Sequence, residues 1–167
     1  MHRLCWLLLL CLLPMIACGD DDGGEEPDRS PAPQQDGGMM YPPVPCPEST
    51  PDFRINLEAE GEDGNVVGRL LDADNIPPDQ YENDWTVEFR TPDGEPVEDV
   101  DLYMAWPFMP VHGHDGFYDP EVEALNEPGQ FQVDDLNLWM IGPWEVHLMV
   151  ESASAGNDHV VFNVCIR

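Results

Sequence analysis

Apolar and polar residues alternate along much of the second half of the chain. Trp85, Val87 and Phe89 are separated by polar residues, and a period of two is typical of a strand with one buried face. The same alternation predicts strands in six further segments: 53–57, 100–104, 131–133, 136–140, 144–150 and 160–166.

Turn-forming residues separate these segments. Thr91-Pro92-Asp93-Gly94 and Glu127-Pro128-Gly129 are the clearest examples, because Pro and Gly supply the backbone angles that turns require. Seven to eight short strands with irregular turns fit a sandwich better than a barrel. The sequence therefore predicts an all-β domain over residues 53–167, an antiparallel immunoglobulin-like β-sandwich.

The first residues have the features of a secretory signal. A short basic start, Met1-His2-Arg3, precedes the apolar run 4–13, which is too short to span about 30 Å of hydrocarbon as a helix. Met15-Ile16-Ala17-Cys18-Gly19 resembles the lipobox of bacterial lipoproteins. The resemblance implies a signal peptide at 1–17, acylation of Cys18 and attachment to a lipid bilayer at the cell envelope, on the periplasmic or cell-surface side. An ordinary cleaved signal that leaves a free protein is the alternative.

Residues 18–52 have a different composition. From Gly19 they contain nine acids, one Arg and many Pro and Gly residues, and such a segment buries too little apolar area to offset the entropy of ordering. We expect a disordered acidic tether between the anchor and the sandwich.

The charge balance narrows the range of partners and activities. The 167 residues carry 34 acids against six Arg and no Lys, for a net charge of −28. Such a surface repels nucleic acid. The chain also lacks G-x-S-x-G, H-E-x-x-H, C-x-x-C and Gly-rich phosphate motifs, so we expect a protein that is not an enzyme.

The cysteines divide into two groups. Cys5 and Cys11 belong to the predicted signal and Cys18 to the lipobox, which leaves Cys46 and Cys165. A single remaining pair in an oxidising compartment predicts one disulfide between the two ends of the sandwich. The alternative is that Cys165 is a soft metal ligand.

One short segment concentrates possible metal ligands. Met109, His112 and His114 fall within six residues, and the i, i+2 spacing of the histidines puts both on one side of an extended segment. Imidazole with thioether favours copper over calcium or magnesium. The alternative is a tight turn around Pro110 and Gly113 in which the histidines are solvated and Met109 packs.

The region from Trp85 onward resembles the YtkA-like family, which is related to FixH-type proteins. The residues that support this are Met-Pro-Val-His-Gly-His at 109–114 and Met140-x-Gly142-x-Trp144, within a resemblance over about 83–166. The resemblance implies an extracytoplasmic immunoglobulin-like sandwich, with some relatives linked to copper handling in cytochrome oxidase assembly. It assigns Met109, His112 and His114 to a copper loop and adds Met140. The predicted lipid anchor and acidic tether depart from FixH-type members, which have a membrane helix.

Two functions remain open at this point. The first is a copper-binding lipoprotein for buffering or delivery, whose partners are a copper ion and a copper-receiving envelope protein. The second is a module without metal that engages another envelope component through a sheet edge or an aromatic loop. His147 and His159 are predicted to be an outward-facing strand residue and a solvated residue, and either Trp106 or Trp139 is expected beside the histidine loop.

Overall fold

Two antiparallel sheets make up the folded part of the chain. The computed structural model describes residues 42–167, so the predicted signal peptide, Cys18 and most of the tether lie outside it. The first sheet has the order β1 (Glu58–Glu60), β2 (Val67–Ala73), β3 (Trp85–Arg90), β7 (Gln130–Asp134) and β6 (Glu121–Ala124). The second has the order β5 (His114–Asp115), β4 (Asp101–Met109), β8 (Gly142–Glu151) and β9 (Asp158–Ile166).

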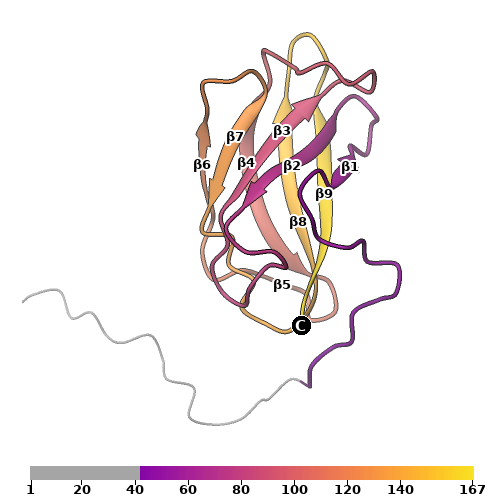
Figure 1. Ribbon diagram of the computed structural model, residues 1–167, viewed down its shortest axis with the longest axis vertical. Helices are drawn as coiled ribbons and strands as arrows, with labels where there is room; N and C mark the ends of the chain where they lie inside the picture. Colours follow the sequence, from indigo (N-terminus) through magenta and orange to yellow (C-terminus); the bar gives the residue numbers. More distant parts are fainter. Residues whose placement is uncertain (1–41) are drawn as a thin grey trace, which may run out of the picture. The chain divides into compact units, whose positions relative to one another are not determined.

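The sheets lie face to face, as Figure 1 shows, and the predicted all-β sandwich is confirmed. Residues 42–167 contain nine strands, more than the seven to eight expected, and β1 and β5 are only two or three residues long. No helix in this part of the chain is long and apolar enough to cross a membrane.

The alternation in the sequence produces the core directly. In β8 every second residue from Trp144 to Val150 is buried, and the same holds along most of β9. The edge of the Trp85 ring meets Phe162 at a centroid distance of 6.1 Å, which joins the inner faces of the two sheets. Burial of such large side chains is the main term that stabilises a domain of this size.

Two predicted strands are wrong. Residues 53–57 form a turn that precedes β1, and residues 136–140 make only one isolated bridge, at Leu138. Leu136 and Leu138 are fully buried, so their alternation reflects burial of every second side chain and not membership of a β-strand. Their backbones bond instead to Asn83 and Tyr81 in the connection before β3.

The alternation over residues 100–104 predicts that Met104 is buried with Leu102, and this prediction is also wrong. The register between β4 and β8 shifts between Leu102 and Met104, and a bulge of this kind turns the following side chain to the opposite face. Met104 is therefore 51% exposed while Leu102 is buried.

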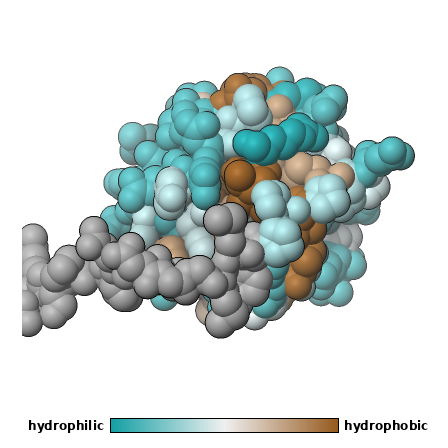
Figure 2. Space-filling model, turned by 90° about the horizontal axis from the view of Figure 1, so that it is seen from below, coloured by the Kyte–Doolittle hydropathy of each residue, from teal (hydrophilic) through white to brown (hydrophobic). Residues whose placement is uncertain are grey.

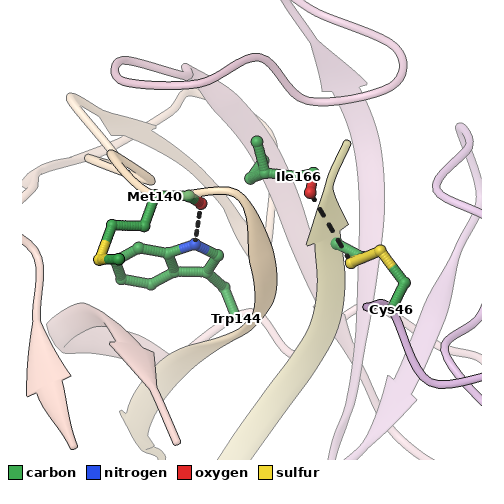
Figure 3. The surroundings of a disulfide bond; sticks show 5 residues. Cys46, Met140, Trp144 and Ile166 are labelled. Carbon is green, nitrogen blue, oxygen red and sulfur yellow. Dashed lines mark hydrogen bonds between the residues drawn. A yellow bond between two sulfur atoms is a disulfide. The ribbon is translucent and has the colours of Figure 1, made fainter. Parts of the chain in front are cut away.

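The predicted disulfide between Cys46 and Cys165 is confirmed. Their Cα atoms lie 5.9 Å apart and their sequence separation is 119. Figure 3 shows the bond joining the segment before β1 to the end of β9, where the Cys165 sulfur also faces the carbonyl of Ile166. The bond fixes the entry of the folded chain beside its C-terminus.

A buried carboxylate connects the turn after β1 to the start of β9. The Asp158 carboxylate accepts backbone hydrogen bonds at 2.8 to 3.0 Å from Asp63, Asn65, Val66 and His159. Burial acts to raise the pKa of Asp158, but these N–H donors outweigh it and hold the pKa below its ordinary value. A Cβ on Gly61 would lie 2.1 Å from the carboxylate, so only glycine permits this approach.

We expect removal of the disulfide to destabilise the sandwich strongly. The chain-entropy model gives about 4–5 kcal/mol as an upper value for a closed loop of this length. Urea unfolding of the Cys46→Ala/Cys165→Ala variant measures the loss. A reducing agent should lower the stability of the parent protein and leave the variant unchanged, and equal stability of the two proteins would contradict the prediction.

Replacement of Asp158 by Asn should cost about 2–3 kcal/mol at neutral pH, because charge-assisted hydrogen bonds are lost and an NH₂ group faces backbone donors. A lowered folded-state pKa means that the carboxylate contributes stability above its unfolded pKa of about 3.9 and loses it as the pH falls through the folded value. The gap between parent and variant in urea unfolding should therefore shrink below about pH 4. The exposed Asp101→Asn is the matched control, and a gap independent of pH would refute the assignment.

Candidate metal site

The predicted histidine loop is a hairpin that joins β4 to β5. The backbone N–H groups of His112 and Gly113 both donate to the carbonyl oxygen of Met109, at 3.2 and 2.8 Å. Gly113 has a φ of 67°, a left-handed conformation that favours glycine. The chain then returns as β5, with His114 opposite Met109. The histidines are thus placed by a turn, as in the alternative interpretation around Pro110 and Gly113, and not by the extended segment that their i, i+2 spacing predicted.

His114 points directly at a thioether from another loop. Its Nε2 atom lies 3.3 Å from the Sδ atom of Met140, although the two residues are 26 positions apart. Its Nδ1 atom lies 2.9 Å from the carbonyl oxygen of Asp115, and a carbonyl oxygen can only accept a hydrogen bond. Nδ1 therefore carries the hydrogen, and in the neutral ring Nε2 presents a lone pair to the sulfur.

Stacked rings surround His114. The ring of Trp139 lies 4.9 Å from His114 between centroids, with 25° between the planes, and Phe117 stacks on Trp139 at 4.5 Å. His112 lies 5.9 Å from His114 with its ring plane turned by only 12°. Of the two tryptophans that the sequence left open, Trp139 is the one beside the loop.

A hydrogen bond to its backbone carbonyl holds Met140 in place. The indole N–H of Trp144 donates to the Met140 carbonyl at 2.8 Å, and Figure 3 shows the Met140 side chain running beside that indole. Trp144 is buried in the core, so a rigid residue fixes the loop that delivers the sulfur.

Met109 lies inside the core, with no exposed surface. A Cβ on Gly142 would lie 2.7 Å from the Met109 methyl carbon, Cε, so this methyl packs against the start of β8. This placement favours the packing interpretation of Met109 that the sequence left open. The structure thus brings together His112, His114 and Met140 and gives Met109 a position among buried side chains.

Apolar side chains border these residues at the same end of the sandwich. Val111, Phe117 and Ile141 are 55%, 68% and 39% exposed, and they lie in or beside the loops that carry His112, His114 and Met140. Figure 2, which views this end, shows apolar surface among hydrophilic surface. The site is therefore accessible from solvent and has an apolar border.

Harder ligands do not gather in this way. Among residues 42–167, no three His, Cys, Asp or Glu side chains are arranged to hold a metal ion together. The donors at the hairpin are two imidazoles and a thioether, a combination that suits copper better than calcium, magnesium or structural zinc.

The other two histidines of residues 42–167 form a contact that the sequence pattern does not predict. His147 and His159 were predicted to face solvent separately, but His147 Nδ1 lies 2.9 Å from His159 Nε2. Burial first, and then the charge of His159, lower the pKa of His147, against the opposing effect of Glu145. Only the β8–β9 register reveals this pairing, and no single-strand pattern contains it.

The fold and site define a class: a two-sheet β-sandwich with an imidazole–thioether cluster at one end of its four-stranded sheet. Residues 69–149 match the family model described as YtkA-like. The match begins and ends earlier than the predicted 83–166; it includes the hairpin and Met140 and ends before β9. No curated protein and no solved structure matches the chain.

Proposed function

We propose that this protein is an extracytoplasmic, lipid-anchored YtkA-like domain that binds Cu(I) through His112, His114 and Met140, for copper buffering or delivery. The observation that supports it most directly is the 3.3 Å separation between His114 Nε2 and Met140 Sδ.

The separation suits one ion bonded to both atoms. With metal–nitrogen and metal–sulfur bonds of about 2.0 and 2.3 Å, donors at this distance subtend about 100° at the metal. Because His114 Nδ1 donates to the Asp115 carbonyl, a neutral His114 ring and the thioether would face each other with lone pairs only. A cation between them removes that repulsion, and the carbonyl contact is the kind of outer interaction that orients a ligating histidine.

The surroundings favour the reduced ion. Thioether ligands are soft and select Cu(I), which needs few ligands and tolerates apolar surroundings. Trp139 stacks on His114, and Phe117 stacks on Trp139, so aromatic rings border one side of the imidazole. His112, whose ring lies 5.9 Å from that of His114 between centroids, would supply the third donor.

A second candidate function rests on a different observation. Val111, Phe117 and Ile141 expose apolar surface at this end of the sandwich, as a module that engages another envelope component would require. In the copper proposal the same residues form the contact with a copper-receiving protein.

Titration with Cu(I) against a chromophoric chelator tests the copper proposal. We expect one bound equivalent to be lost, or weakened at least about tenfold, in His114→Ala and Met140→Leu, since even outer-shell changes cost 10- to 100-fold. His112→Ala should weaken the same equivalent less. Met109→Leu is the matched control, because a packed methionine can be replaced by leucine without loss of binding.

The outcome against the proposal is equally definite. Unchanged affinity in His114→Ala and Met140→Leu, with both variants folded by circular dichroism, would leave the interaction module as the function. The anchor is tested separately: the protein should label with a fatty acid and remain with membranes, whereas Cys18→Ser should not.

A further inference from the structure

A second group of soft donors lies on the outer face of the four-stranded sheet. His147 on β8 and His159 on β9 face each other at 2.9 Å, and their side chains are only 12% and 23% exposed. The Trp106 ring on β4 stacks on His147 at 4.6 Å with 5° between planes, and on His159 at 5.7 Å. One indole thus packs against both imidazoles.

Each imidazole has a carboxylate at its other nitrogen. His147 Nε2 lies 3.2 Å from Glu145, and His159 Nδ1 lies 3.3 Å from Glu62. Both contacts are at ion-pair distance, and His147 Nε2 makes no hydrogen bond. A carboxylate this close favours the proton on the nearer nitrogen, which allows the facing nitrogen of each ring to act as an acceptor. Histidines that bind metals have such carboxylates behind them.

The strand register adds a thioether. Met149 lies directly opposite His159 in the β8–β9 pair and two residues from His147, on the same outer face. Side chains directly opposite in an antiparallel pair have Cβ atoms about 4.5–5.5 Å apart, within reach of a flexible methionine. On the other side of Met149, the register places the exposed Met104 of β4.

A proton alone explains only part of this arrangement. One hydrogen between the facing imidazoles satisfies both nitrogens, but it has no use for a sulfur atom beside them. Two imidazoles with a thioether, in contrast, provide a trigonal soft ligand set. Among the residues that the structure describes, no third His, Cys, Asp or Glu is placed to hold a metal ion together with these two histidines.

We propose that His147, His159 and Met149 form a second Cu(I) site on the outer face of the sheet, with Trp106 covering it and Met104 at its border. The site is separate from the hairpin, because His147 is five residues along β8 from Gly142, about 17 Å at the rise of a strand. It does not rest on the proposed function of the hairpin, since it uses none of the same residues.

Stoichiometry with separate variants tests the second site. The purified full chain is titrated with Cu(I) against a chromophoric chelator, and we expect two equivalents for the parent. His147→Ala/His159→Ala should lose one of the two equivalents. Met149→Leu should weaken, at least about tenfold, the equivalent that the double variant loses. Asn163→Ala is the matched control, because Asn163 is exposed on the same face of β9 and is not a proposed ligand.

The two sites can fail independently. If the parent binds one equivalent that His147→Ala/His159→Ala loses and Met149→Leu weakens, while His114→Ala and Met140→Leu leave it unchanged, the hairpin proposal fails and the sheet site stands. If only His114→Ala and Met140→Leu lose copper, the sheet site is overturned and the His147–His159 contact is a hydrogen bond alone. Binding that needs both histidines but is indifferent to Met149→Leu also overturns the proposed ligand set. Circular dichroism and thermal unfolding of each variant exclude loss of the fold as the cause.

Discussion

The pairing of β8 with β4 on one side and β9 on the other is the constraint on which the rest of the structure depends. Its register puts His147 between Trp106 and Val161 and sets Met149 opposite His159. The same strand begins at Gly142, against which the Met109 methyl packs. A shift by one residue would turn every one of these side chains to the opposite face, so the core and both candidate sites have a common geometric origin.

The alternation that builds the core also decides where soft donors are available. Apolar residues of β8 occupy the inner face, and the intervening positions carry Glu145, His147 and Met149. A rigid inner face holds these outward side chains in fixed positions, which is what a binding site built on a strand requires. At the hairpin the support is different: Trp144 in the core bonds the loop that carries Met140. The two candidate sites therefore use one sheet in two ways, one across its face and one at its end.

The sequence was sufficient for those features that one strand or simple counting determines. The period-two spacing of Trp85, Val87 and Phe89 predicts β3. The disulfide follows because Cys46 and Cys165 are the pair left after the N-terminal cysteines are set aside. The strand predicted at Leu136 and Leu138 was wrong because their alternation reflects burial and not pairing in a sheet. The burial predicted for Met104 was wrong because the sequence of one strand does not reveal a β-bulge. The contacts of His114 with Met140 and of His147 with His159 depend on how distant segments align, which periodicity does not encode.

The strong negative charge bears on selectivity as well as on solubility. A net charge of −28 raises the concentration of every cation near the surface, and it does so without regard to chemical type. Abundant carboxylates bind hard ions such as calcium weakly unless several of them converge, and in the described part of the chain they do not. Selectivity between hard and soft cations must then come from donors other than the abundant carboxylates. In this protein those are the few imidazoles and thioethers that the sheet brings together, and a soft ion attracted by the general field would be retained only there.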